Sequence, residues 1–283
     1  MKTLAVIAHT GKTFGGGLDE LRRLIAGHGV EKLWWYEVPK SRKAPKKMRK
    51  ALAHRPDLIL VWGGDGMVQR CVDTVVGHDV PIAVLPAGTA NLFAGNLGIP
   101  TDLPAAFDVA TSGRRRRIDL GRMNGEHFAV MAGAGFDAEM IKRADGGAKK
   151  RLGRLAYIWA GARGLAEPVM TVTVKVDGTV WFRGDATCVL VGNVPKVFGS
   201  VAVFDDARPD DGLLDVGVAT ATNPVQLGHA LLKVATGRTE DAPHIKVAQA
   251  RRITIRSARR MRTEMVACGI GSGGSKSGWR PRR

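Results

Sequence analysis

The stretch LILVWGGDG, residues 58–66, joins an uninterrupted apolar run to a turn of glycine and aspartate. Further along, IAVLPAGTAN, residues 82–91, has the same form. A helical pattern follows the first turn, with Met67, Val68, Cys71, Val72, Val75 and Val76 on one face. Short apolar runs separated by helices are typical of a parallel sheet that is covered on both faces.

The same rhythm extends to the beginning of the chain. Apolar runs occur at residues 4–8 and 33–38, and the segment between them places Leu18, Leu21, Leu24 and Ile25 on one helical face. We therefore predict an α/β nucleotide-binding domain over residues 1–118, a parallel sheet with helices on both faces.

Beyond the arginine run 114–117 the pattern changes to a period of two. Residues 171–176 alternate between apolar and polar, and Asp177-Gly178 is typical of a hairpin turn. Further strands are predicted at residues 187–192, 213–218 and 252–256, with one basic helix at 149–165. We predict an antiparallel β-sandwich domain over residues 119–265, followed by a disordered tail at 266–283 that is rich in Gly, Ser, Lys and Arg.

The charge balance indicates an acidic partner. The chain holds 43 Lys and Arg against 26 Asp and Glu, a net charge of +17. A nucleotide, a nucleic acid or an anionic membrane would suit this charge. The sequence does not favour nucleic acid as the partner, because no helix-turn-helix, zinc or aromatic-basic RNA motif accompanies the charge. Three scattered cysteines and no signal-peptide pattern favour the cytoplasm.

Three loops are expected at the carboxyl edge of the parallel sheet, at residues 9–13, 63–66 and 86–91. Unpaired amides at the start of a helix bind anions, and glycine lets phosphate oxygens approach the backbone. A Gly-Asp turn alone is common in loops, but the second turn favours a phosphate site. The predicted ATP-binding residues are Thr10, Gly11, Lys12, Gly63, Gly64, Asp65, Gly66, Met67, Gly88, Thr89 and Asn91.

Asp65 is the informative residue of the first glycine turn. A carboxylate beside phosphates is repulsive unless Mg²⁺ lies between them or the carboxylate is directed elsewhere. Its presence favours a complex of ATP with Mg²⁺.

The two turns resemble the catalytic domain of diacylglycerol-kinase-like lipid kinases, which includes sphingosine-kinase relatives. The resemblance continues through residues 118–121, 133–138 and 206–216 and spans residues 1 to 264. It implies ATP contacts from Gly63, Gly64, Asp65, Gly66 and Thr89, and a catalytic role for Asp65 and Asp119. It also implies a structural Mg²⁺ held by the Asp211 carboxylate and the carbonyls of Arg208 and Leu213.

The family resemblance implies an ATP-dependent lipid kinase that phosphorylates the hydroxyl of a diacylglycerol or a sphingoid-like lipid. The enzyme would lie in the cytoplasm, associated peripherally with an anionic membrane through basic residues such as those at 114–117. A homodimer is compatible with the sequence. The alternatives are a non-catalytic module that binds ATP and lipid, and a soluble-substrate kinase related to NAD kinase, which shares the Gly-Gly-Asp-Gly loop.

The chain departs from the family pattern at three places. Met67 replaces the threonine of the first turn, Leu92 replaces an aspartate after the second, and residues 266–269 read Val-Ala-Cys-Gly where an Asp-Gly-acid segment is expected. That acid is the proposed general base, which contributes roughly 10² to 10⁴ in rate. Impaired turnover is therefore expected, and the abrupt change of composition leads to the hypothesis that the tail is an out-of-frame or otherwise altered C-terminus.

Overall fold

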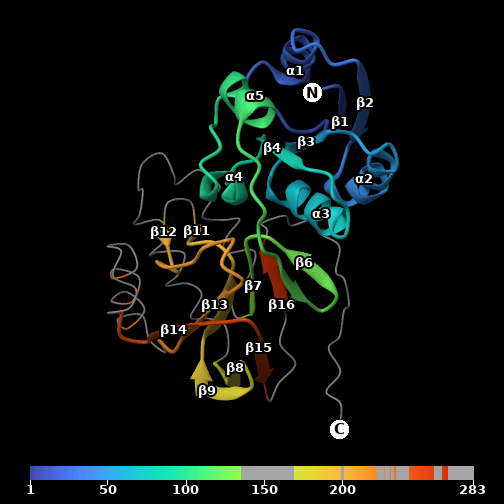
Figure 1. Ribbon diagram of the computed structural model, residues 1–283. Helices are drawn as coiled ribbons and strands as arrows, with labels where there is room; N and C mark the ends of the chain where they lie inside the picture. Colours follow the sequence, from blue (N-terminus) through green and yellow to red (C-terminus); the bar gives the residue numbers. More distant parts are fainter. Residues whose placement is uncertain are drawn as a thin grey trace. The chain divides into compact units, whose positions relative to one another are not determined.

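The computed structural model describes residues 1–134, 169–198, 201–221, 242–257 and 263–266, with residues 226, 230 and 233. The chain divides into two compact units, Met1–Arg117 and Ile118–Val266 (Figure 1). Each unit has its own hydrophobic core and is described separately below.

The first unit is built on a four-stranded parallel sheet. Its strands are β1 (Thr3–His9), β2 (Lys32–Val38), β3 (Leu58–Gly63) and β4 (Ile82–Pro86), in the order β2-β1-β3-β4. All six residues of β3 are buried, as expected of a central strand without polar residues. The predicted parallel sheet is confirmed.

Helices cover both faces of this sheet. They are α1 (Gly17–Ala26), α2 (Ala44–Ala53), α3 (Asp65–Val75), α4 (Leu92–Asn96) and α5 (Leu103–Ser112), with a short 3₁₀ turn, η1 (Ser41–Lys43), before α2. Leu4, Val6 and Ala8 of β1 point to a core shared with α1 and α5. The opposite face packs against α2 and α3 (Figure 1).

The second unit contains two antiparallel sheets. One has the order β14-β13-β10-β7-β16, from β14 (Ile245–Ala250), β13 (Leu214–Ala219), β10 (Cys188–Gly192), β7 (Met131–Ala134) and β16 (Thr263–Val266). The other has the order β15-β8-β9, from β15 (Ile253–Ser257), β8 (Met170–Val176) and β9 (Thr179–Ala186). The described residues of this unit also form two hairpins, β5 (Gly121–Met123) with β6 (Glu126–Phe128), and β11 (Lys196–Phe198) with β12 (Val201–Ala202).

Apolar residues of both sheets form one core in this unit, so the predicted β-sandwich is confirmed. Asp177 and Gly178 have φ values of 48° and 92°, as a tight hairpin turn requires. The hairpins β5–β6 and β11–β12 and the strands β14 and β16 were not predicted. The predicted helix at 149–165 and nearly all of the predicted disordered tail lie outside the described residues. Among the described helices, none is long and apolar enough to cross a membrane.

Candidate functional site

The two glycine turns of the first unit pack directly on each other. β3 and β4 are neighbours, and the Ala87 amide donates a hydrogen bond to the Gly63 carbonyl at 3.0 Å. A β-carbon on Gly88 would lie 2.5 Å from the α-carbon of Gly64, and one on Gly64 would lie 3.0 Å from that of Gly88. Neither position has room for a side chain, so the turns form one bare backbone surface at the carboxyl edge of the sheet.

Asp65 connects the first turn to the second. The residue begins α3 and is 4% exposed. Its Oδ1 accepts a hydrogen bond at 3.1 Å from the amide of Phe93, in the first turn of α4. The first amides of a helix have no partner within the helix, and here the carboxylate of another helix supplies one. The carboxylate is therefore directed into the protein, and Asp65 by itself does not indicate a metal ion.

The electrostatics of Asp65 follow from this burial. Loss of hydration raises the pKa of its carboxyl group above the ordinary value, while hydrogen bonds from the amides of Phe93 and Leu92 oppose that rise. The amide dipoles of α4 thus partly compensate a charge that is almost fully withdrawn from water.

Asn91 closes the second turn on itself. Its side-chain oxygen accepts from the Gly88 amide at 2.8 Å, and its side-chain nitrogen donates to the Gly88 carbonyl at 2.8 Å. The residue has the left-handed conformation, with φ of 47° and ψ of 47°. Both polar groups of the Asn91 side chain are thus hydrogen-bonded within the turn. Thr89, by contrast, is exposed at the tip of the turn, where its hydroxyl can bind a ligand.

The loop after β1 is anchored to its neighbours. The Thr10 amide donates to the Val38 carbonyl at 3.0 Å, and the Trp62 indole donates to the Lys12 carbonyl at 3.1 Å. The Nδ1 of His9 accepts from the Gly11 amide at 3.1 Å, and burial, followed by the charge of Lys12, lowers the pKa of His9. His9 therefore serves as a neutral acceptor. Lys12 is an exposed cation of this loop, and its backbone carbonyl is bound to Trp62, the residue before Gly63.

Met67, also predicted to bind ATP, is buried in the first unit. Its side chain is 1% exposed and lies under Gly63, where an added β-carbon would be 2.6 Å from the Met67 β-carbon. Its amide donates to the Gly64 carbonyl at 2.8 Å. Both the thioether and the amide of Met67 are therefore engaged inside the unit, and its contact with ATP stays a prediction.

The predicted acidic residues of the second unit meet in one loop. Asp119 donates its amide to the Pro209 carbonyl at 2.6 Å, and its Oδ2 accepts from the Gly212 amide at 2.7 Å. The next amide, that of Leu213, donates to Asp211 Oδ1 at 2.9 Å. Two successive amides thus hold the carboxylates of Asp119 and Asp211, which the sequence assigned to separate sites.

Asn193 was missed by sequence reasoning. Its side-chain nitrogen donates to the Asp119 carbonyl at 2.7 Å and to the Ala129 carbonyl at 3.2 Å. The residue is 1% exposed, and its Oδ1 has no hydrogen-bond partner among the described residues. A single polar residue directly after the buried strand β10 was the available signal, and it fixes the backbone that carries Asp119.

Asp215 is a second residue that the sequence did not single out. It is 4% exposed, and burial, together with the charges of Asp211 and Asp206, raises its pKa to about 6, against a hydrogen bond with Gln249. Among the described residues, no group of three His, Cys, Asp or Glu side chains is placed to hold a metal. One carboxylate with the carbonyls of Arg208 and Leu213 remains a suitable set of hard oxygen donors for Mg²⁺.

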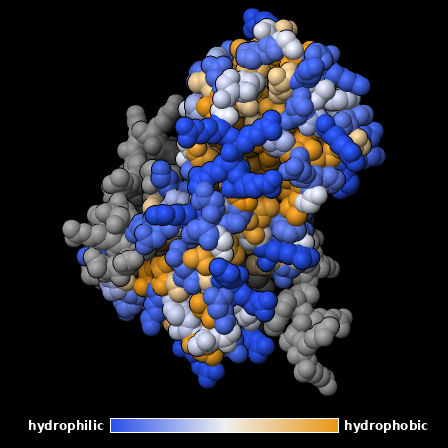
Figure 2. All heavy atoms as spheres, in the orientation of Figure 1, coloured by the Kyte–Doolittle hydropathy of each residue, from blue (hydrophilic) through white to orange (hydrophobic). Residues whose placement is uncertain are grey.

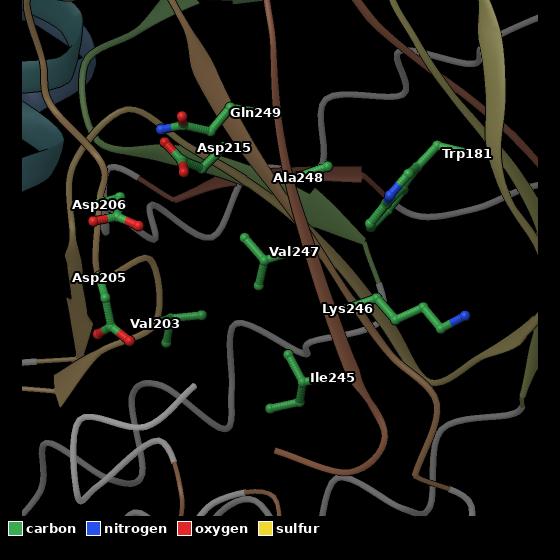
Figure 3. A pocket seen from close by; sticks show the side chains of 10 residues that line it. All are labelled: Trp181, Val203, Asp205, Asp206, Asp215, Ile245, Lys246, Val247, Ala248 and Gln249. Carbon is green, nitrogen blue, oxygen red and sulfur yellow. The ribbon is translucent and has the colours of Figure 1, made fainter. Parts of the chain in front are cut away.

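A cavity of about 500 Å³ is lined in part by Asp205, Asp206 and Asp215 (Figure 3). Carboxylates lie along one part of its wall and residues of β14 along another. Its lining consists of Trp181, Val203, Asp205, Asp206, Asp215, Ile245, Lys246, Val247, Ala248 and Gln249.

Comparison with known proteins matches both units. Residues 8–123 match the model of the diacylglycerol kinase catalytic domain, and residues 130–277 match that of the YegS C-terminal NAD kinase beta sandwich-like domain. A diacylglycerol kinase of Staphylococcus carnosus is 30% identical over 231 residues, which cover 80% of this chain and 74% of that protein. A diacylglycerol kinase of Staphylococcus epidermidis is 28% identical over 225 residues, with 78% and 71% covered.

Solved structures show the same fold. The crystal structure of a diacylglycerol kinase from Bacillus anthracis superposes with a TM-score of 0.69 at 21% identity, covering 93% of this chain and 89% of that one. A candidate diacylglycerol kinase from the same organism superposes with a TM-score of 0.78 at 25% identity, with 96% and 89% covered.

Proposed function

This chain belongs to the family of proteins with a diacylglycerol kinase catalytic domain, and on that premise we propose that it transfers the γ-phosphoryl group of ATP to a lipid hydroxyl. The acceptor would be a diacylglycerol or a sphingoid-like lipid. Family membership supports a kinase, and the lipid acceptor and the use of ATP are the proposal.

The observation that carries the proposal is the contact between the two glycine turns. Side-chain-free backbone at Gly64 and Gly88 allows phosphate oxygens to approach the start of α3, where amides and the helix dipole favour negative charge. Thr89 and Lys12 are exposed around this surface and can add a hydroxyl and a cation. Asp65 fixes the geometry through α4.

The reaction places few chemical demands on the protein. The lipid oxygen attacks the γ-phosphorus, the bond from that phosphorus to the bridging oxygen breaks, and ADP leaves. The hydroxyl proton passes to a base, for which the family's acid after Glu264 is missing. Because phosphoryl transfer depends mainly on positioning and charge stabilisation, we propose impaired turnover instead of none.

We propose that the second unit holds Mg²⁺ through the Asp211 carboxylate and the carbonyls of Arg208 and Leu213. The acidic surroundings support this, since Asp206 and Asp211 both act on Asp215. When bound, the ion would neutralise charge in the 208–213 loop and hold its shape. Asp119, whose carboxylate accepts a hydrogen bond from the Gly212 amide of that loop, would have the catalytic role that the family resemblance implies.

The site would act at an anionic membrane surface, where its lipid substrate lies, with the protein in the cytoplasm and peripherally associated. A homodimer is compatible with the proposal. The alternative function is a non-catalytic module that binds ATP and lipid, which the buried Met67 favours because no hydroxyl stands in its place.

The test is transfer of radioactive phosphate from γ-labelled ATP to a panel of acceptors. Diacylglycerol and sphingosine in mixed micelles would be compared with NAD and fructose 6-phosphate. The proposal expects label in a lipid, more of it with the variant Val266→Asp, Ala267→Gly, Cys268→Glu. Label in NAD or the sugar would identify a soluble-substrate kinase. ATP binding without label in any lipid by either chain would favour the non-catalytic module.

A further inference from the structure

The positive charge of the first unit is concentrated in one segment. Residues 1–117 hold 18 Lys and Arg and 10 Asp and Glu. Eight of the 18 cations lie between Lys40 and Arg55, so the rest of the unit is balanced at ten of each sign. No acidic residue occurs from Val38 to Pro56. The basic face is defined here as Lys40, Arg42, Lys43, Lys46, Lys47, Arg49, Lys50 and Arg55.

The fold turns these cations outward together. α2 buries Ala44, Met48, Ala51 and Leu52 against the sheet and α3, and it exposes Lys46, Arg49, Lys50 and Ala53. Lys47 is partly buried and the other seven cations are exposed. Hydrophilic residues cover most of the visible flank of the unit on which α2 lies (Figure 2). Within the described part of the chain, none of the eight forms an ion pair.

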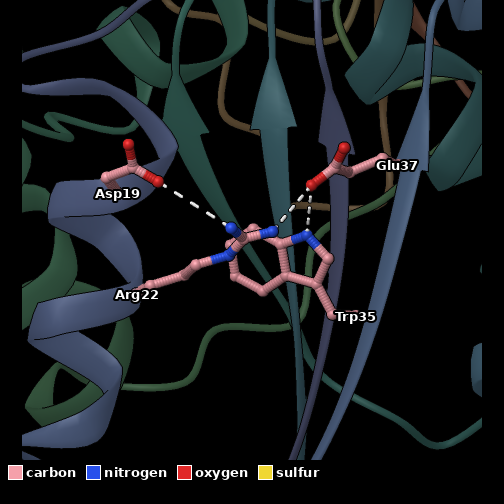
Figure 4. A network of polar contacts seen from close by, with 4 residues as sticks. All are labelled: Asp19, Arg22, Trp35 and Glu37. Carbon is pink, nitrogen blue, oxygen red and sulfur yellow. Dashed lines mark hydrogen bonds and ion pairs between the residues drawn. The ribbon is translucent and has the colours of Figure 1, made fainter.

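The other side of β2 is organised differently (Figure 4). There Arg22 of α1 lies 3.8 Å from Asp19 and 3.0 Å from Glu37, and its guanidinium stacks 4.6 Å from the centre of the Trp35 ring. The Trp35 indole donates to Glu37 at 2.7 Å. Arg22 on this side forms ion pairs with two carboxylates of the same unit. The cations of the basic face form none among the described residues, so their charge can be neutralised by an external partner.

Two aromatic side chains border the basic face. Trp34 of β2 stacks on His54 at the end of α2, with ring centres 4.5 Å apart, and the ammonium of Lys32 lies 5.0 Å from its centre. Tyr36 lies 5.7 Å from the ammonium of Lys47. Partly exposed Trp and Tyr beside Lys and Arg are typical of proteins that rest at the boundary of a bilayer.

We propose that the basic face, with Trp34 and Tyr36 at its border, is a docking surface for the headgroups of an anionic phospholipid bilayer. The inference deepens the proposed function, on which it rests for the choice of partner, and it assigns membrane contact to the nucleotide-binding unit. The complementarity of charge carries it, since eight cations, none in an ion pair among the described residues and seven of them exposed, lie on α2 and on the segments directly before and after it. Single-stranded nucleic acid fits less well, because its bases need open aromatic faces, and the ring of Trp34 is already covered by His54 and approached by Lys32.

The test is sedimentation of the full chain with phosphatidylcholine vesicles that contain or lack a quarter of phosphatidylglycerol. The triple variant Lys46→Gln, Arg49→Gln, Lys50→Gln removes three exposed cations of α2. Its matched control, Arg122→Gln, Arg183→Gln, Arg256→Gln, removes three exposed cations of the second unit. We expect the unmodified chain to bind the anionic vesicles in a salt-dependent way and the triple variant to bind about 100-fold more weakly. The control should bind within about threefold of the unmodified chain.

Three results would overturn the inference. The triple variant could bind like the unmodified chain, both variants could weaken equally, or the unmodified chain could bind a DNA duplex and not the vesicles. The kinase proposal is tested separately with a short-chain diacylglycerol dissolved as monomers. Phosphorylation of that substrate without vesicle binding refutes the docking surface alone, and vesicle binding without phosphorylation refutes the proposed kinase alone.

Discussion

Gly64 and Gly88 face each other so closely that a methyl group on Gly88 would lie 2.5 Å from the α-carbon of Gly64. The two residues lie in the turns that follow β3 and β4, and the contact unites two sequence motifs into one surface. Neither glycine adds a side chain at the point of contact, and the Asn91 side chain is bonded to the Gly88 backbone beside it. The absence of side chains at both glycines favours the approach of phosphate oxygens to the start of α3.

The variant Gly88→Ala should therefore separate the two turns. Overpacking at this point is expected to lower the free energy of unfolding by about 2 kcal/mol and the affinity for ATP by about tenfold or more. Gly95→Ala is the matched control, since nothing lies within 4 Å of a β-carbon at that helical position. Urea unfolding and calorimetric titration with ATP measure both effects, and equal behaviour of the two variants would refute the packed surface.

Asp65→Ala should destabilise the protein by about 1 to 3 kcal/mol, because the amide of Phe93 would lose its acceptor inside the unit. Asp65→Asn keeps an oxygen acceptor. We expect this variant to keep most of the free energy of unfolding and, when measured in the absence of Mg²⁺, most of the affinity for ATP. If Asp65→Asn instead unfolds as readily as Asp65→Ala, the interaction of Asp65 with the Phe93 amide depends on the charge of the carboxylate. An oxygen acceptor alone would then not explain the stabilising role of Asp65.

The buried carboxyl group of Asp65 also predicts a pH dependence. Its pKa in the folded state is above the ordinary value of 3.8, so the folded state binds this proton more tightly than the unfolded state. Its stabilising contribution is complete below pH 3.8 and is lost as the pH rises through the raised pKa. The stability of the unmodified chain, measured against Asp65→Asn by urea unfolding, should decrease over that window, and an increase would contradict the burial of the charge.

Magnesium binding at the 208–213 loop predicts a stabilisation that depends on Asp211. Millimolar Mg²⁺ should raise the melting temperature of the unmodified chain, because a ligand of the folded state stabilises it. Asp211→Asn should abolish this rise. Asp108→Asn, an exposed carboxylate of the first unit, makes the same charge change and should preserve it. A rise that survives in Asp211→Asn would place the ion elsewhere.

Much of the fold followed from local pattern. β3 is apolar at every position and was predicted from that run, and the Asp177-Gly178 turn was predicted from its residue types. β14, by contrast, reads IKVAQA, with two polar side chains, and its pairing with β13 is a long-range choice that local periodicity does not encode. Short strands such as β5 and β6 carry too few residues to establish a period.

The candidate site was predictable in its residue types and less so in their roles. The glycines at 64 and 88 indicated backbone without side chains, and the close contact between the two turns requires glycine at both positions. The sequence could not show that Asp65 points to α4, that Met67 turns inward, or that Asn91 closes its own loop, because each depends on the direction of a side chain in three dimensions. The link between Asp119 and Asp211 joins residues far apart in the chain.

The central claim is that the paired glycine turns bind the ATP from which a lipid is phosphorylated. The most direct measurement is the initial rate of label transfer from γ-labelled ATP to diacylglycerol in mixed micelles, with the unmodified chain, Gly88→Ala and Gly95→Ala assayed side by side. The account predicts labelled lipid from the unmodified chain and Gly95→Ala, and at least about a tenfold lower rate from Gly88→Ala. No labelled lipid from any folded chain, or an equal rate from Gly88→Ala, would contradict it.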